Sequence, residues 1–173
     1  YHRYLARCQF LLGQGRGVAD IAYLGLEGAP HVFRPPPSAL TGAPPDRRGH
    51  NFVGLAPEWL TGAGVKDGRI VLPSGASYRL LVLPASETMT PGLLRKIDQL
   101  VRAGATILGA PPKKSPSLSG HPACDAEVGA LAREIWGEGA GDAEGGRVHG
   151  AGRVFRVGVL LYVNHLALEK QLG

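Results

Sequence analysis

The chain has 173 residues, a formal net charge of +5 and a hydrophobic content of 44%. This length suits one domain with a sizeable core, and no apolar run reaches the roughly 18 residues of a membrane-spanning helix. The basic residues are scattered, and Arg47-Arg48 and Lys113-Lys114 are only doublets, which favours a solvated surface over a nucleic-acid site. Two cysteines make no disulfide framework. We therefore expect a soluble globular protein without nucleic-acid or membrane partners.

The first segment predicts a helix. Apolar residues recur at helical spacing from Tyr1 to Leu12, and Gly13 follows as a helix-ending residue. Cys8 falls on the apolar stripe, so we expect it to be a buried free thiol. Because the first residue already belongs to this predicted helix, we interpret the chain as part of a larger protein.

Two short strands and a helical turn are expected next. Val18–Leu24 is a mostly apolar run that predicts the first strand, and Asp20 would lie inside it in a structural role. A long loop rich in Gly and Pro follows from Gly28. His50–Gly54 predicts a short second strand, and Pro57–Leu60 predicts one or two helical turns.

The middle of the chain alternates turns with strands. Asp67-Gly68 predicts a tight turn, because these residue types adopt positive φ at low cost. Arg69–Leu72 would be a small strand after that turn. Arg79–Leu83 is almost entirely apolar, as is typical of a parallel strand buried on both faces.

A helix should begin at Thr90-Pro91, since Thr is a good N-cap and Pro a good first helical residue. Gly104 closes this helix, and Ala105–Leu108 predicts the next buried strand. The residues expected on the buried face of the helix are Leu93, Leu94, Ile97, Leu100 and Val101.

A second helix is expected with Asp125 as N-cap and Gly137 as its end. Arg147–Val148 and Arg153–Val159 are strand candidates within or after a glycine-rich loop, and a final helix is expected over residues 160–172. Alternating buried strands and amphipathic helices predict an α/β fold, with a parallel sheet and helices on both faces.

Three segments together resemble the α-L-rhamnosidase-like proteins of glycoside hydrolase family 106, in the region that follows their catalytic (β/α)8 barrel. They read YLARCQFLLGQGRGVADIAYLG, VKDGRIVLPSGASYRLLVLPASETMTPGLLRKIDQLVRAGATILG and SPSLSGHPACDAEVGALAREIWG. The resemblance covers roughly Tyr1 to Gly137. It implies a three-layer, flavodoxin-like domain similar to class I glutamine amidotransferases, within a bacterial glycoside hydrolase. Residues 1–173 would form this single domain, with a divergent tail at 154–173.

The resemblance also implies which partner the domain would have and which family residues do not carry over to this chain. The partner would be the (β/α)8 barrel of the same polypeptide. A homo-oligomer is left open, and so is export of the parent to the periplasm or the medium. The family has an acidic, aromatic segment where this chain has His50–Gly54, and the tail after Val154 departs from the family pattern. The family's catalytic carboxylates lie on the barrel, so no catalytic residue is carried over to this chain.

Amidotransferase chemistry needs a cysteine at a strand-to-helix elbow. The expected strand ends, at residues 83–86 and 108–111, carry none; Cys8 lies in a predicted helix and Cys124 in a predicted loop. We therefore expect a degenerate amidotransferase-like fold.

Glycoside hydrolysis normally uses two carboxyl groups about 5–9.5 Å apart. Glu27 and Glu87 are weak catalytic candidates, because both follow strands whose carboxyl ends bind ligands in open α/β sheets. Solvated loop positions are favoured for both. Ser86 and Thr88 are weak ligand-binding candidates before the predicted Thr90 helix, where simple capping is the preferred interpretation.

Metal and cofactor motifs are incomplete. The segment His121–Asp125 holds three ligand types, but no second ligand pair accompanies it, so we expect no metal site. Gly13–Gly17 precedes a strand, whereas a phosphate loop follows one, so no cofactor is expected.

The leading interpretation is a non-catalytic accessory domain that supports the barrel or an oligomer interface and docks through its first helix. The alternative is a stand-alone small-molecule-binding or hydrolytic α/β protein with a site at residues 25–27, 85–88 and 109–111. Carbohydrate binding by the domain itself would need an aromatic platform; Trp59 and Trp136 are the candidates, and we expect both in the core.

Overall fold

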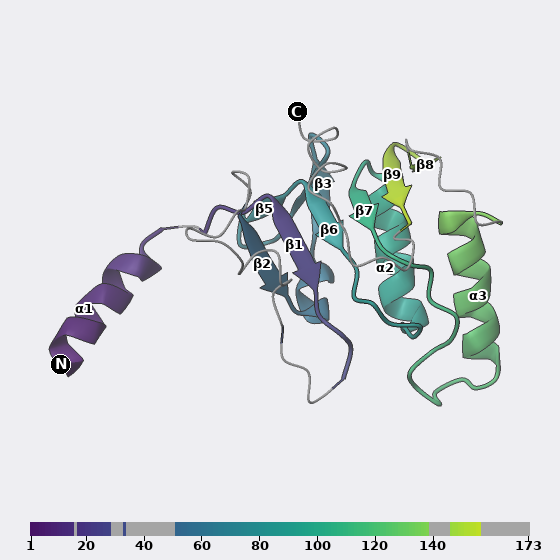
Figure 1. The fold of residues 1–173 in the computed structure, drawn as a ribbon, viewed down its shortest axis with the longest axis horizontal. Helices are drawn as coiled ribbons and strands as arrows, with labels where there is room; N and C mark the ends of the chain where they lie inside the picture. Colours follow the sequence, from purple (N-terminus) through teal and green to yellow (C-terminus); the bar gives the residue numbers. More distant parts are fainter. Residues whose placement is uncertain (16, 29–32, 34–50, 139–145, 157–173) are drawn as a thin grey trace, which may run out of the picture.

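The structure, a computed structural model, describes residues 1–15, 17–28, 33, 51–138 and 146–156. Its main sheet has six strands, and all are mutually parallel except the antiparallel edge strand β8 (Figure 1). Numbered along the chain, the five parallel strands follow the order 2-1-3-4-5, which is the flavodoxin-like order. Across the sheet the strands are β2 (Phe52–Leu55), β1 (Ile21–Leu24), β6 (Leu80–Val82), β7 (Thr106–Leu108), β9 (Gly152–Phe155) and β8 (Arg147–His149).

Helices α2 (Pro91–Arg102) and α3 (Ala123–Trp136) pack beside each other against one face of this sheet (Figure 1). Alternate strand residues point to that face, so they share one core with the two helices. That core includes Ala22, Leu81, Ile107, Val154, Leu94, Ile97, Val101, Val128 and Ile135. The opposite face carries a second apolar cluster built on Ile21, Leu80 and Val82. The predicted α/β class is confirmed.

A small antiparallel sheet lies between β2 and β6 in the chain. It consists of β3 (Gly64–Lys66), β4 (Arg69–Val71) and β5 (Ser77–Tyr78), and a 3-10 helix η2 (Pro57–Leu60) precedes it. Asp67 and Gly68 form the expected turn, with φ of 52° and 71°. The sequence indicated β4 and η2, whereas β3 and β5 were not predicted, because β3 contains one apolar residue between Gly64 and Lys66 and β5 has only two residues.

Two local predictions need correction, and a third is confirmed. Asp20 precedes β1 instead of lying inside it. Its carboxylate Oδ1 lies 3.8 Å from Arg69 Nη2 and 3.7 Å from Arg79 Nε, so it links the small sheet to the main one. Helix α3 begins at Ala123 with Pro122 at the N-cap, so Asp125 falls in its first turn and is not the cap. The predicted cap of α2 is confirmed: Thr90 Oγ1 accepts a hydrogen bond from Leu93 N at 3.3 Å.

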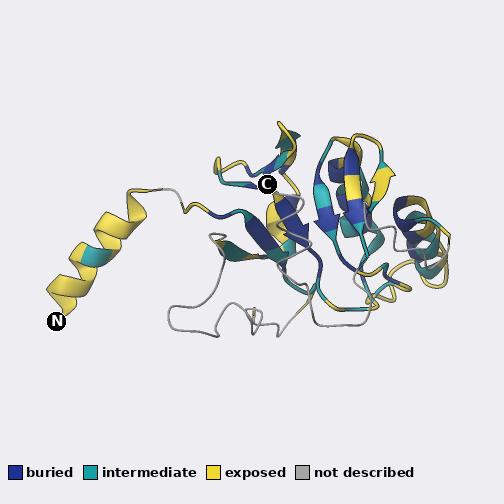
Figure 2. Cartoon of the chain, turned by 45° about the horizontal axis from the view of Figure 1, so that its top comes forward, coloured by how far each residue is buried: buried dark blue, intermediate teal, exposed yellow. Residues whose placement is uncertain are grey.

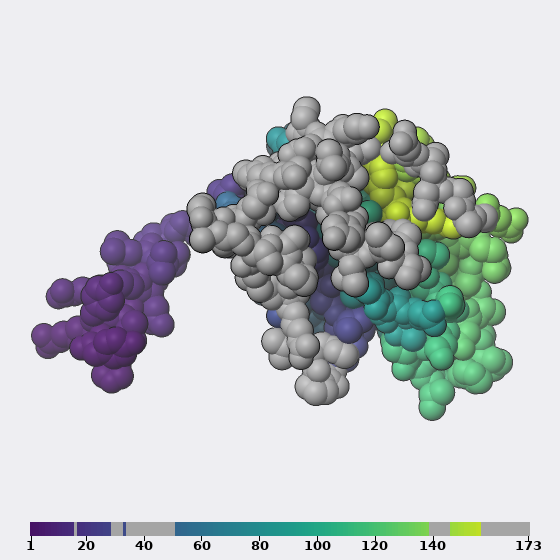
Figure 3. Space-filling model, viewed as in Figure 1, coloured from purple at the N-terminus to yellow at the C-terminus, as the bar shows by residue number. Residues whose placement is uncertain are grey.

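Helix α1 (His2–Gly13) projects from the rest of the chain and buries none of its residues (Figures 2 and 3). The helix itself is as predicted. Cys8 is only half-buried, which corrects the expectation of a buried thiol. The apolar side chains of Tyr4, Leu11 and Leu12, on one side of this helix, are 67%, 70% and 83% exposed. An apolar stripe of this kind on a globular domain normally faces a core.

Some predictions fall outside the described residues. These are the loop over residues 34–49, part of the glycine-rich loop after Gly137, the end of the Arg153–Val159 strand and the final helix at 160–172. Within the described part of the chain, no helix is long and apolar enough to cross a membrane.

A close contact between β9 and α2 yields a test of this packing. A Cβ at Gly152 would collide with the carbonyl oxygens of Val101 and Ala105, which are backbone atoms and cannot rotate away. We expect Gly152→Ala to lower the free energy of unfolding by about 2 kcal/mol or more, measured by urea denaturation. Gly92→Ala is the control, because a Cβ there meets nothing within 4 Å and the residue lies in the first turn of α2, where alanine is well tolerated. Equal stability of the two variants would contradict the packing.

Candidate functional site at the strand ends

The candidate site lies at the carboxyl ends of β1 and β6, where an open α/β sheet binds ligands. From β1 the chain continues to β2 on one side, while β6 lies on the other side, so a topological switch point falls between β1 and β6. The loop after β1 carries Glu27, and the segment after β6 leads through Ser86, Glu87 and Thr88 into α2. The sequence had indicated both loops as the ligand-binding edge.

Glu27 is held at the amino end of α2. Its Oε2 accepts the Thr90 backbone N–H at 2.7 Å, and its Oε1 accepts the Thr90 hydroxyl at 2.5 Å. Both carboxylate oxygens therefore have a donor, and the helix end that favours anions already holds a carboxylate of the chain. Nothing in the sequence pattern indicated this contact, since Glu27 and Thr90 are 63 residues apart.

Glu87 engages a different partner. Its exposed carboxylate pairs with the ammonium group of Lys113. The hydrogen bond and positive charge of Lys113 hold the pKa of Glu87 below its ordinary value, and the charge of Lys114 lowers it further. A catalytic acid needs a raised pKa, so this environment is the opposite of the one that a glycosidase acid requires.

Ser86 and Thr88 hydrogen bond to each other. Ser86 Oγ lies 3.1 Å from Thr88 Oγ1 and accepts the Thr88 backbone N–H at 3.1 Å, which is a local side-chain turn. Thr88 also lines an open hollow of about 410 Å³ at the start of α3. The other lining residues are Lys114, Ser115, Pro116, Ser117, Leu118, His121 and Asp125.

The segment around this hollow is internally bonded. Asp125 Oδ1 accepts the Ser115 backbone N–H at 2.8 Å, which fixes the loop against the first turn of α3. Cys124 lies in that first turn and is buried, not in a loop as expected. Among the described residues, no group of three metal-capable side chains comes together.

The two tryptophans differ. Trp136 is buried as expected, and its Nε1 donates to Gly109 O at 2.9 Å, which ties the end of α3 to the end of β7. Arg156 Nη2 donates to the carbonyls of Trp136 and Gly137 at 3.0 and 2.8 Å. Trp59 in η2 is 57% exposed, which corrects the expectation that it belongs to the core.

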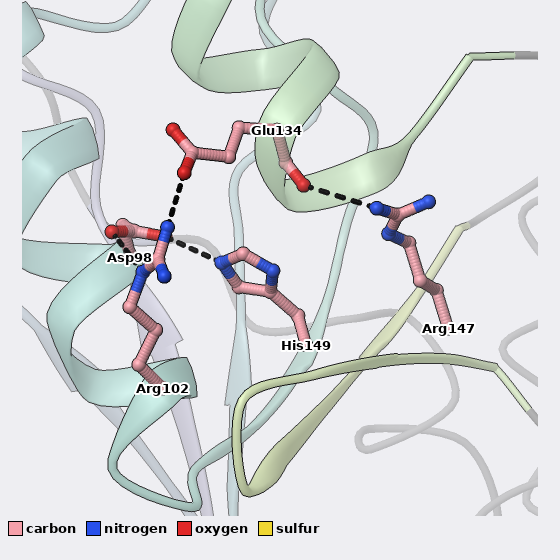
Figure 4. Close-up of polar contacts among 5 residues, drawn as sticks. All are labelled: Asp98, Arg102, Glu134, Arg147 and His149. Atoms are coloured by element: carbon pink, nitrogen blue, oxygen red, sulfur yellow. Dashed lines mark hydrogen bonds and ion pairs between the residues drawn. The ribbon is translucent and has the colours of Figure 1, made fainter.

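A polar cluster that the sequence did not indicate joins α2, α3 and β8 (Figure 4). Asp98 accepts from Arg102 Nε at 2.7 Å and lies 2.6 Å from His149 Nε2. Arg102 also pairs with Glu134, and Arg147 Nη2 donates to the Glu134 carbonyl at 3.4 Å. The cluster contains no serine, cysteine or threonine nucleophile, so its geometry fits a clamp between elements and not a catalytic triad.

The structure defines an α/β domain of flavodoxin-like strand order, in which the Glu27 carboxylate is bonded at the amino end of α2. The chain belongs to the glycoside hydrolase 106 family, described as alpha-L-rhamnosidase, whose model matches residues 1–160. The resemblance seen in the sequence is thereby confirmed.

Two relatives are much longer than this chain. A protein of Formosa agariphila named "Putative beta-glucuronidase" is 41% identical over 136 residues, which are 79% of this chain and 11% of that protein. The solved structure of a rhamnosidase from Novosphingobium sp. PP1Y is 30% identical with a TM-score of 0.69, over 98% of this chain and 15% of that one. This chain therefore corresponds to a small part of each relative.

The contact between Glu27 and α2 predicts a stability difference between the two candidate carboxylates. We expect Glu27→Ala to lower the free energy of unfolding by about 1.5–3 kcal/mol, because it removes charge-assisted hydrogen bonds and a favourable charge at a helix amino end. Glu87→Ala is the matched control and should change the stability little, since the Glu87–Lys113 pair is exposed. Urea denaturation of both variants is the measurement, and the reverse order would contradict the assignment.

The pKa of Glu87 yields a separate prediction. Because Lys113 lowers this pKa in the folded protein, the pair contributes stability above the ordinary carboxyl range, and that contribution is lost as the pH falls through the lowered pKa. We expect Lys113→Gln to raise the Glu87 pKa toward its ordinary value, followed by NMR titration of the side-chain carboxyl carbon. An unchanged titration curve would show that Lys113 does not hold this carboxylate in solution.

Proposed function

We propose that this chain is a non-catalytic domain that supports the catalytic part of an α-L-rhamnosidase-like glycoside hydrolase in carbohydrate breakdown. The observation that carries the proposal is helix α1, whose apolar stripe is exposed and packs on nothing within the described residues. Such a stripe needs a partner surface. The partner in this proposal is the rest of the same polypeptide, including a (β/α)8 catalytic barrel.

The state of the strand ends supports a non-catalytic role. Both oxygens of Glu27 are bonded to Thr90, and Glu87 is paired with Lys113. The carboxylate of Glu27 is engaged at the amino end of α2, and the lowered pKa of Glu87 does not suit a general acid. The expected strand-to-helix elbows also lack a cysteine, as the sequence indicated. The acid and base for sugar cleavage would then come from another part of the polypeptide.

The mechanical role follows from how the body of the domain is built. Helices α2 and α3 share the core of the sheet, and the Asp98 cluster fixes them to the β8–β9 hairpin. A body of this kind resists deformation, so it suits a layer that holds neighbouring loops or an oligomer interface in place. In this proposal residues 1–173 form one domain. The start of its divergent tail pairs in the sheet, since Val154 in β9 lies opposite Ile107 in β7.

The alternative of a stand-alone binding or hydrolytic protein has one observation in its favour, the hollow beside Thr88. Its volume of about 410 Å³ is near the lower end for small-molecule pockets. Asp125, one of the charged groups lining it, already accepts a backbone N–H from Ser115. The supporting-domain proposal explains α1 as well, so we prefer it.

The test is hydrolysis of an aryl α-L-rhamnoside by two proteins, this purified chain and the longer natural polypeptide that carries it. Circular dichroism first establishes that the chain is folded. We expect turnover by the longer protein and none by the chain. Turnover by the chain alone would overturn the proposal and direct attention to Glu27 and Glu87.

Substitutions in the longer protein sharpen the test. Glu27→Gln and Glu87→Gln should each leave kcat within about twofold of the parent, because neither group contacts substrate in this proposal. Loss of a general acid or base costs about 100-fold or more, so a drop of that size in a folded variant would assign the residue to catalysis.

A further inference from the structure

Helix α1 carries exposed apolar side chains on two opposite sides. At about 100° per residue, its stripe places Leu5, Leu11 and Leu12, with Tyr4 and Cys8 between them, within an arc of about 120°. Phe10 lies about 160° from the centre of that arc. Phe10 is 66% exposed, close to the 67% of Tyr4 and the 70% of Leu11 on the stripe. One partner surface on the stripe would therefore leave a large aromatic ring in water.

The helix also has little support of its own. It has 12 residues, no side-chain hydrogen bond at its N-cap, no acidic residue in its first turn and no basic residue in its last turn. Isolated helices of about 12–15 residues or fewer are marginal in water. Packing from outside the described body must therefore supply the stability that holds α1 helical.

We propose that α1 is an internal helix of the longer polypeptide, held between two surfaces, one on its stripe and the other on Phe10. This inference rests on the proposed function. The occupant of both sides is the remainder of the same chain, because this chain corresponds to 11% of one relative and 15% of the other. A polypeptide of that length has ample surface to enclose a helix of 12 residues.

The polar residues beside Phe10 indicate the character of the second surface. Arg3 and Arg7 lie about 20° and 60° from Phe10 around the helix, and both are exposed. Charge complementarity then favours an apolar pocket for the Phe10 ring with acidic groups along its rim. The stripe side carries no charged residue between Leu11 and Leu5, so the surface opposite it should be apolar throughout.

The experiment compares Phe10→Glu, Leu12→Glu and the control Gln9→Glu in the longer protein and in this chain. Thermal unfolding and limited proteolysis between Gly13 and Val18 are the measurements. In the longer protein we expect Phe10→Glu and Leu12→Glu each to lower the unfolding midpoint by several degrees and to speed cleavage, while Gln9→Glu matches the parent. In this chain alone, none of the three should move the midpoint, because these side chains are already exposed.

The outcomes separate this inference from the proposed function. If Leu12→Glu destabilises the longer protein but Phe10→Glu behaves like the control, the helix docks on one side only; the inference is then wrong and the supporting role stands. If neither variant has an effect, docking through α1 fails as well. Light scattering on this chain alone adds a third outcome. A dimer that Phe10→Glu dissociates would place a second copy on that side and overturn the inference.

Discussion

The burial of α2 against the parallel sheet and against α3 is the constraint on which the rest of the domain depends. Leu94, Ile97 and Val101 are fully buried and belong to the same core as residues of β6, β7 and β9. Other contacts are built around this helix. The β8–β9 hairpin closes on its carboxyl end, where Ala151 N donates to Arg102 O at 3.1 Å and Gly152 leaves room for the backbone. The loop after β1 closes on its amino end through Glu27.

This arrangement has a consequence for chemistry at the strand ends. In a flavodoxin-like sheet the amino end of the helix after the switch-point strand is the natural place for an anionic ligand. Here the carboxylate of Glu27 takes that place and uses both of its oxygens to do so. A ligand would have to displace a charge-assisted pair that also holds the β1 loop in position. The same interaction therefore joins the β1 loop to α2 and supplies a carboxylate at this helix end.

Sequence reasoning succeeded where the interacting residues lie close together along the chain and missed contacts between distant segments. The cap, the apolar face and the glycine stop of α2 lie within one segment, so the pattern predicted the helix closely. The Asp67-Gly68 turn was predicted for the same reason. Contacts between distant segments left no such pattern: Glu27 meets Thr90 across 63 residues, and Asp98 meets His149 across 51. Asp125 shows a subtler failure, because a residue type that suits an N-cap instead bonds Ser115 N from within the first helical turn. The prediction for Trp59 was wrong for a different reason. Its apolar side chain in a short helix was expected to be buried, yet it is 57% exposed.

The contrast between α1 and the body suggests how stability is divided along this chain. In α2 the same residues supply helix, cap and core, so the helix and its packing are specified together within the chain. In α1 the sequence specifies an amphipathic helix but the described residues offer it no packing surface. Exposed leucine and aromatic side chains gain no burial free energy from helix formation alone. An amphipathic helix of this kind therefore needs a packing surface to be stable. In this proposal the stability of α1 therefore depends on a surface of the longer polypeptide, whereas α2 and α3 are stabilised by contacts within the described body.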